Sequence, residues 1–118
     1  MIMQTIALIY MHNLRYGRAH AVLKRWADEY PDSARAYQYR GWVLERMNQP
    51  KSALDDYLQA LEADPNLDRV RIRVAELYLE DKEPQKALPH LEALLARDPN
   101  QAEGLARLGQ CRDRKSVV

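Results

Sequence analysis

Cysteine, glycine and phenylalanine are scarce in this sequence, and each scarcity excludes a class of protein. The single cysteine, Cys111, rules out an internal disulfide and any metal cluster built from several thiolates. Four glycines and no phenylalanine in 118 residues argue against an all-β protein with many tight turns. A lone thiol fits a reducing compartment, and we therefore expect a cytoplasmic protein.

An excess of charge of either sign is also lacking. Eighteen Lys and Arg face 17 Asp and Glu, which gives a formal net charge of +1. This balance provides no basic footprint for nucleic acid or for an anionic membrane, and we expect neither as a partner. The apolar start, MIMQTIALIYM, is too short to cross a bilayer and lacks the basic region and cleavage site of a signal peptide. We expect it to form a buried first helix.

Groupings of side chains that support catalysis or metal binding are missing as well. The histidines, His12, His20 and His90, form neither an HxxxH nor an HExxH pattern, which would place two zinc ligands on one helix face. Asp55 and Asp56 are adjacent and therefore point to different faces of a helix. There is no Gly-rich phosphate loop and no nucleophile motif. We expect no catalytic residue, no metal, no cofactor and no enzymatic activity.

The main positive signal is an internal repeat of 34 residues. The strings YPDS, DPNL and DPNQ recur at 30–33, 64–67 and 98–101. Small residues recur at the same step in two series, Ala7, Gly41, Ala75 and Gly109, and Ala19, Ala53 and Ala87. Within each unit, apolar residues spaced i, i+3, i+4 and i+7 predict pairs of amphipathic helices. The small residues would let the two helices of a pair approach closely.

Proline marks the ends of these helices. It follows each predicted second helix and begins two of them, at Pro31, Pro65, Pro99, Pro50 and Pro84. The pattern predicts an all-α fold of seven helices, over residues 2–13, 17–30, 34–47, 51–63, 68–81, 85–97 and 102–112. Pro89 falls inside one of them, where we expect a tilt and not a break.

Together these positions resemble the tetratricopeptide repeat (TPR) family, whose 34-residue pattern combines aromatic, small, apolar and proline positions. The second repeat matches best, with Tyr37, Gly41, Leu44, Ala53, Tyr57, Ala60 and Pro65. Two positions depart from the pattern. Arg40 stands where the family usually has Leu, and Arg71 stands where the third repeat would have its aromatic residue. The resemblance implies an α-solenoid of antiparallel helix pairs, about three repeats plus one extra terminal helix.

The repeat register predicts one TPR domain over 1–112 and a short tail over 113–118. The repeats are 1–33, 34–67 and 68–101, and 102–112 is the first helix of a fourth. We expect the tail to be disordered or non-native and the chain to be a slice of a longer array. The alternative is that 102–112 is a solvating helix that closes the stack.

The family usually binds an extended peptide or a helix of a partner on a concave face lined by the first helices. The resemblance therefore implies a protein–protein interaction scaffold. Projecting one face of each first helix predicts the groove residues Gln4, Leu8, Met11, Arg35, Gln38, Trp42, Arg69, Ile72 and Arg73. Trp42 lies off the core stripe, and it is either a partner anchor or packed against a neighbouring helix under arginine side chains. Arg69 and Arg73 pair either with an acidic partner or with carboxylates of their own surface.

One TPR subclass holds the C-terminal carboxylate of chaperones between basic and amide side chains. Only Arg69 and Arg73 match its positions, while Gln4, Leu8 and Tyr39 do not, so we reject a full carboxylate clamp. Two other functions stay open. The chain is either an appendage of a larger enzyme whose catalytic domain lies outside it, or a self-associating module that stacks through exposed repeat ends.

Overall fold

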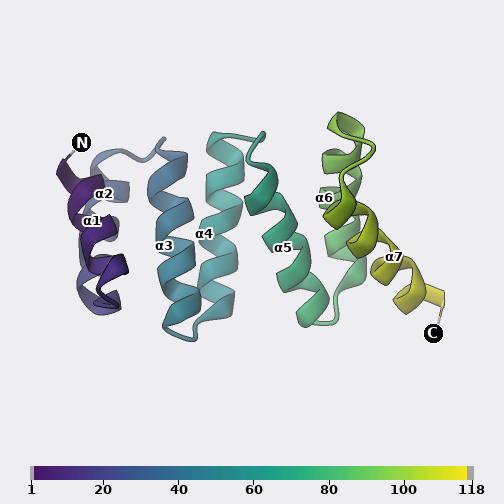
Figure 1. Ribbon diagram of the computed structural model, residues 1–118, viewed down its shortest axis with the longest axis horizontal. Helices are drawn as coiled ribbons and strands as arrows, with labels where there is room; N and C mark the ends of the chain where they lie inside the picture. Colours follow the sequence, from purple (N-terminus) through teal and green to yellow (C-terminus); the bar gives the residue numbers. More distant parts are fainter. Residues whose placement is uncertain (1, 117–118) are drawn as a thin grey trace. The chain divides into compact units, whose positions relative to one another are not determined.

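Residues 2–116, the part of the chain that the computed structural model describes, form seven α-helices and no strand (Figure 1). The helices are α1 (Ile2–His12), α2 (Tyr16–Glu29), α3 (Ala34–Arg46), α4 (Pro50–Ala63), α5 (Asp68–Glu80), α6 (Pro84–Arg97) and α7 (Ala102–Ser116). The first six begin and end within one residue of the predicted bounds. Helix α7 continues past the predicted end at 112, so its backbone is helical as far as Ser116. The last two residues of the predicted tail lie outside the described part.

The chain divides into two compact units, Met1–Asn66 and Leu67–Val118, where the sequence suggested a single domain. The division falls one residue before the predicted boundary between the second and third repeats. The first unit holds α1 to α4, and the second holds α5 to α7.

The first helix of each repeat ends in the same left-handed turn. Leu14, Asn48 and Lys82 have φ values of 59°, 61° and 59° and are separated by 34 residues. In each turn the following N–H donates to a carbonyl five residues back, Arg15 to Tyr10 at 2.8 Å, Gln49 to Leu44 at 2.9 Å and Glu83 to Tyr78 at 2.8 Å. These bonds define a Schellman motif, which satisfies carbonyls that a helix end leaves open. Neither Leu nor Lys favours this conformation, so the turn was not predictable from them.

We expect Lys82→Gly to raise the free energy of unfolding by about 0.5–1 kcal/mol, because glycine adopts positive φ without the Cβ clash that lysine suffers. The Lys82 side chain is exposed, so its removal disturbs no packing. Asn48→Gly is the matched control and should change stability less, since asparagine tolerates this region. Urea denaturation followed by circular dichroism measures both. An unchanged or lower stability of Lys82→Gly would contradict the prediction.

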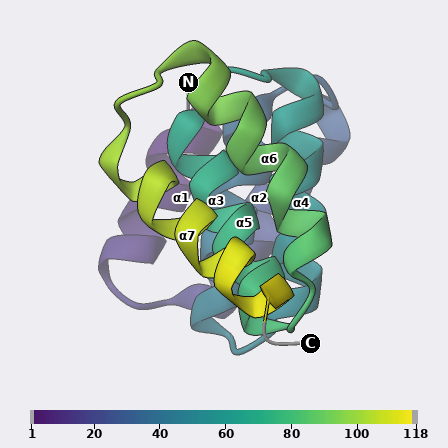
Figure 2. The ribbon, with the colours of Figure 1, turned by 90° about the vertical axis from the view of Figure 1, so that its right-hand side faces the viewer.

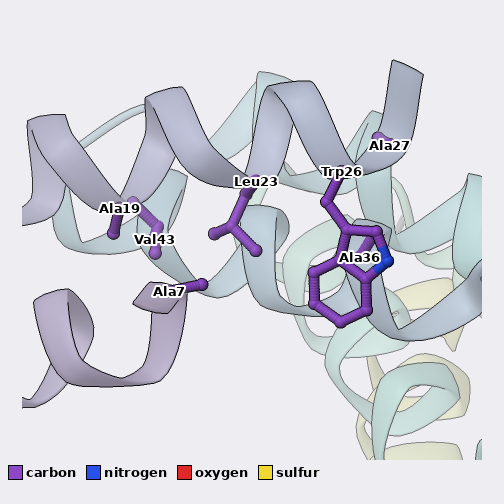
Figure 3. Packing of buried hydrophobic residues seen from close by; sticks show 7 residues of the cluster. All are labelled: Ala7, Ala19, Leu23, Trp26, Ala27, Ala36 and Val43. Atoms are coloured by element: carbon purple, nitrogen blue, oxygen red, sulfur yellow. The ribbon is translucent and has the colours of Figure 1, made fainter. Parts of the chain in front are cut away.

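The core of the first unit lies where α2 packs between α1 and α3 (Figure 3). The buried residues of this cluster are Ala7, Ala19, Leu23, Trp26, Ala27, Ala36 and Val43. Trp26 reaches across to α3, where its ring meets Tyr39 edge-on at 6.1 Å between centroids. Helix α1 contributes only Ala7 to the buried set, and Ile2 and Ile9 are 78% and 52% exposed. The expectation of a buried first helix was therefore wrong for all but one face of α1.

The close approach of α3 and α4 depends on Gly41. A Cβ at this position would lie 2.6 Å from Cε1 and 2.8 Å from Cδ1 of the Tyr57 ring. Tyr57 is buried, and its hydroxyl donates to Glu45 at 2.5 Å, so the ring is held in place. The sequence predicted a small residue here, and the structure shows that only the smallest fits opposite a tyrosine.

In the other repeats, the two side chains at the equivalent helix contact have different sizes. Sixteen residues separate Gly41 from Tyr57, and the equivalent pairs are Ala7 with Leu23 and Ala75 with Leu91. All four residues of these two pairs are buried. A smaller residue on the first helix thus accompanies a larger one on the second, and the repeats fill similar volumes with different residues.

The second unit is built around α6, and α7 lies beside α6 and contacts α5 (Figure 2). One core cluster of this unit consists of the buried residues Ala75, Leu79, Ala87, Leu91 and Cys111. The thiol of Cys111 donates to the carbonyl oxygen of Pro84 at 3.6 Å. Helix α6 is continuous across Pro89, as expected, because one ladder bond lost beyond the first turn does not break a packed helix.

Candidate functional site

The predicted groove residues lie on α1 and α3 of the first unit and on α5 of the second. We call the exposed face of α3 that carries Arg35, Gln38 and Trp42 the α3 face. These residues are spaced i, i+3 and i+7, which places them on one side of the helix. On α1, Leu8 is 40% exposed, while Gln4 and Met11 are half-buried, and Met11 packs against the core.

Trp42 was expected either to anchor a partner or to pack against a neighbouring helix, and its surroundings have features of both. Its ring meets Tyr16 of α2 edge-on, with centroids 6.0 Å apart and planes at 70°. The guanidinium of Arg46 lies 5.2 Å from the ring centroid, in a cation–π contact. Trp42 nevertheless stays 37% exposed. The side chain is held by its neighbours and still presents apolar surface to solvent.

Tyr16 is a contact that sequence reasoning missed. The projection considered only first helices, whereas Tyr16 begins a second helix. Its register supplied a usable signal, because Pro50 and Pro84 occupy the same position in the next two repeats. Tyr16 is a half-buried aromatic residue at a position where the next two repeats have proline. This difference indicates that Tyr16 has a contact that the prolines lack, and the contact is with Trp42.

On α5, the predicted groove residues differ in their exposure and in their ion pairing. Ile72 is only 6% exposed, so it offers little surface to a partner. Arg73 lies 3.4 Å from both Glu76 and Glu80. Arg69 is exposed. The hypothesis of internal pairing therefore holds for Arg73, and Arg69 is left facing solvent.

Glu76 is the centre of this charged network. Besides Arg73, it accepts hydrogen bonds from Arg107 of α7, at 2.7 Å from Nη2 and 3.0 Å from Nε. A small pocket of about 140 Å³ adjoins the network and is lined by Glu76, Leu79, Glu80, Arg107 and Gln110. Two arginines neutralise one carboxylate, so the central charge of this surface is already satisfied inside the second unit.

Arg40, the residue that departs from the TPR pattern, has a specific partner. Its Nε and Nη2 donate to the two carboxylate oxygens of Asp56, each at 2.8 Å. Asp56 is 6% exposed, and the pair links α3 to α4. The hydrogen bonds to Asp56 raise the pKa of the Arg40 guanidinium above its ordinary value. The buried pair replaces the apolar contact that leucine would make.

Arg71, the second residue that departs from the TPR pattern, has a partner at the repeat position that Asp56 occupies. Its Nη1 lies 3.1 Å from Nδ1 of His90, which follows Asp56 by 34 residues. Arginine only donates hydrogen bonds, so Nδ1 is the acceptor and the ring is neutral, with its proton on Nε2. The ring of Tyr78 stacks on the imidazole of His90, with the ring centroids 6.0 Å apart. Both departures are thus arginines that meet a polar residue at one fixed position of the second helix.

We expect the second unit to lose stability in acid through His90. Burial, and then the charge of Arg71, lowers the pKa of His90 below its usual 6.5. The folded state therefore keeps His90 neutral, while the unfolded chain takes up a proton near pH 6.5. Stability is complete above that pH and falls as the pH drops through 6.5 toward the lowered pKa, by at most about 1.4 kcal/mol per pH unit.

The measurement is the free energy of unfolding between pH 7.5 and pH 5, for the wild type and for His90→Gln. A glutamine oxygen can accept from Arg71 without titrating, so the variant should lose this part of the pH dependence. His12 and His20 are present in both proteins and cancel from the comparison. Identical pH profiles for the two proteins would show that His90 does not carry the effect.

The paired helices, the 34-residue step in their turns and the recurring small-residue positions define an all-α helical repeat fold of the solenoid class. Tetratricopeptide repeat models match residues 34–67 and 68–111. The chain belongs to the tetratricopeptide repeat family, which confirms the resemblance seen in the sequence.

Three similar proteins give this membership a context. The human protein O-mannosyl-transferase TMTC3 is 36% identical over 81 residues, which are 69% of this chain and 9% of that protein. The Yersinia enterocolitica type III secretion chaperone SycD, solved with a peptide of the translocator YopD, has a TM-score of 0.83 at 18% identity and covers 96% of this chain and 92% of its own. The first TPR of Spaghetti (RPAP3), bound to the HSP90 peptide SRMEEVD, has a TM-score of 0.83 at 16% identity, with coverages of 98% and 91%. The two solved structures share the fold with this chain.

Within residues 2–116, no helix is long and apolar enough to cross a membrane. The same residues contain no group of three or more His, Cys, Asp or Glu side chains placed to hold a metal ion.

Proposed function

We propose that this chain is a protein-interaction scaffold that binds an extended peptide or a helix of a partner, without catalysis of its own. The observation that carries the proposal is Trp42 on the α3 face, an aromatic side chain held by Tyr16 and Arg46 yet 37% exposed. Fixed aromatic residues with remaining apolar surface are frequent hot spots of protein interfaces. The two peptide-bound structures of the same fold support a peptide as the partner.

The remaining groove residues differ in how accessible they are to a partner. Leu8 and Arg35 are exposed, and Gln4, Met11 and Gln38 are half-buried. On α5, Arg69 is available to an acidic group, whereas Arg73 would have to leave Glu76 and Glu80 first. We therefore expect Trp42 to contribute more to binding than Arg73.

A peptide array probed with the purified chain tests the proposal. The wild type is compared with Trp42→Ala and with Arg69→Ala plus Arg73→Ala. Tyr30→Ala is the control, because Tyr30 is an exposed aromatic residue at the C-cap of α2 and not on α3. We expect Trp42→Ala to weaken retained peptides at least tenfold, and Tyr30→Ala to bind like the wild type. Equal binding by the wild type and Trp42→Ala would contradict the proposed surface, provided that both have the same circular dichroism spectrum.

A second candidate function is self-association through α1. Ile2 and Ile9 occupy the register of Ala36 and Val43, which are buried in the core where α2 packs on α3. The face of α1 that these isoleucines form carries no charged residue, so a second copy could pack on it without charge repulsion. Sedimentation analysis should then show a mass that rises with concentration for the wild type and stays monomeric for Ile9→Glu. A monomeric wild type at high concentration would remove this candidate.

The likeness to TMTC3 supports a third possibility, a TPR appendage of a larger enzyme. This chain spans only 9% of that protein, so a transferase activity concerns a part outside the present sequence. The complete reading frame of the gene decides the matter, since an appendage requires a catalytic domain in the same frame.

A further inference from the structure

We propose that the partner of the α3 face carries a large apolar side chain and, two residues away in an extended segment, an Asp or Glu. This inference rests on the proposed function and names the chemistry of its partner. The apolar side chain packs on Trp42, and the carboxylate pairs with Arg46. We call Tyr16, Trp42 and Arg46 the Trp42 cluster.

The apolar half of the proposal follows from how Trp42 is held. The edge-on contact with Tyr16 and the cation–π contact with Arg46 restrict the indole before any partner arrives. A preorganised aromatic side chain loses little conformational freedom on binding, so the burial of its exposed part contributes almost fully. An aliphatic or aromatic side chain of the partner is the group that gains from covering this surface.

The acidic half follows from the charges around the cluster. Arg46 touches Trp42, Arg15 directly precedes Tyr16, and Arg35 lies two turns earlier on the α3 face, and all three side chains are exposed. The nearest carboxylate along α3 is Glu45, and it already accepts the hydroxyl of Tyr57 at 2.5 Å. Helix α1 has no acidic residue. The accessible charge next to Trp42 is therefore positive, and a carboxylate is its complement.

The spacing of the two partner residues follows from the geometry of the cluster. The guanidinium carbon of Arg46 lies 5.2 Å from the centroid of the Trp42 ring. In an extended peptide, neighbouring side chains point to opposite faces, while residues i and i+2 share a face about 6.5–7 Å apart. An apolar residue and a carboxylate separated by one residue thus meet Trp42 and Arg46 together, whereas directly adjacent ones do not.

The second unit does not offer the same chemistry. Glu76 occupies the position of Trp42 one repeat later, and it is neutralised by Arg73 and Arg107. That repeat position therefore carries no apolar side chain, and the charge of Glu76 is already paired. We therefore assign the preference for an apolar and acidic segment to the first unit.

Tryptophan fluorescence tests the proposal directly. The chain has two tryptophans, and Trp26 is buried while Trp42 is partly exposed, so a ligand at the cluster changes the emission of Trp42 and its quenching by acrylamide. The probes are synthetic Ser/Gly peptides that contain Leu-Ser-Glu, Leu-Ser-Lys or Leu-Glu-Ser. We expect the Leu-Ser-Glu peptide to bind at least tenfold tighter than the other two.

A charge reversal provides the matched variant. Arg46→Glu should prefer the Leu-Ser-Lys peptide over the Leu-Ser-Glu peptide, while Lys51→Glu, an exposed reversal on α4, should keep the wild-type order. Because the readout is a change of preference, a general loss of stability in Arg46→Glu cannot produce it. A wild type that shows no preference among the three peptides, or an Arg46→Glu variant with the wild-type order, overturns the inference.

Different results would contradict the partner chemistry and the scaffold function. Peptides that bind the wild type on the array and lose affinity in Trp42→Ala, but show no preference for an acidic residue, overturn the partner chemistry and leave the scaffold function standing. A Trp42→Ala variant that retains every array peptide overturns both.

Discussion

Replacing Asp56 with alanine is expected to lower the free energy of unfolding by about 3 kcal/mol. The change leaves the guanidinium of Arg40 largely buried between α3 and α4 without its two 2.8 Å hydrogen bonds. Removing one partner of a buried ion pair typically costs about 3–5 kcal/mol, and the partial exposure of Arg40 places the effect at the lower end. Urea denaturation followed by circular dichroism measures the loss.

The double variant Arg40→Leu plus Asp56→Leu is the matched control. It restores the apolar residue that the family usually has at the first position and removes both charges together. Replacing a buried ion pair by apolar residues of similar volume is often neutral or stabilising. We expect the double variant to lie within about 1 kcal/mol of the wild type. If Asp56→Ala costs no more than a surface substitution, the pair does not hold α3 against α4.

Adding a single methyl group at Gly41 should also destabilise the protein, by about 1–2 kcal/mol. The new Cβ meets the ring of Tyr57 at 2.6 Å, and the resulting overpacking outweighs the gain of about 1 kcal/mol that Ala has over Gly in a helix. Gly109 has the same register on α7, and a Cβ there meets nothing within 4 Å. Gly109→Ala should therefore stabilise the protein by up to about 1 kcal/mol.

The other repeats suggest the compensating change. Gly41→Ala combined with Tyr57→Leu recreates the Ala and Leu pair of the first and third repeats, so it should recover part of the loss caused by Gly41→Ala alone. Recovery will be incomplete because Tyr57→Leu removes the hydrogen bond to Glu45. Thermal unfolding of the single and double variants provides the comparison. A double variant less stable than the sum of its two single changes would contradict the size-pairing explanation.

Most of the helix arrangement was predictable from the sequence, because it depends on local and repeated information. The amphipathic spacing, the prolines at helix ends and the 34-residue step located six of the seven helices to within one residue. Helix α7 was the exception. Its charged end, RDRKS, shows no apolar periodicity, and only the helical backbone of the structure extends it to Ser116.

The candidate site was less predictable. The helical projection correctly placed Trp42 on an exposed face, yet it could not show that Tyr16 and Arg46 hold the ring. It did not show that Ile72, which lies on the projected face, is only 6% exposed. A projection describes one helix alone, whereas the exposure of a side chain depends on which other helices pack around it.

The sequence by itself determined the family, the all-α repeat fold and the absence of a recognisable catalytic motif, because a repeated pattern states the same local preferences several times. Only the tertiary structure decided the partners of the residues that break the pattern. Arg40 meets Asp56, Arg71 meets His90, and Gly41 meets Tyr57. These pairs join different helices, and their geometry exists only after α3 has packed on α4 and α5 on α6.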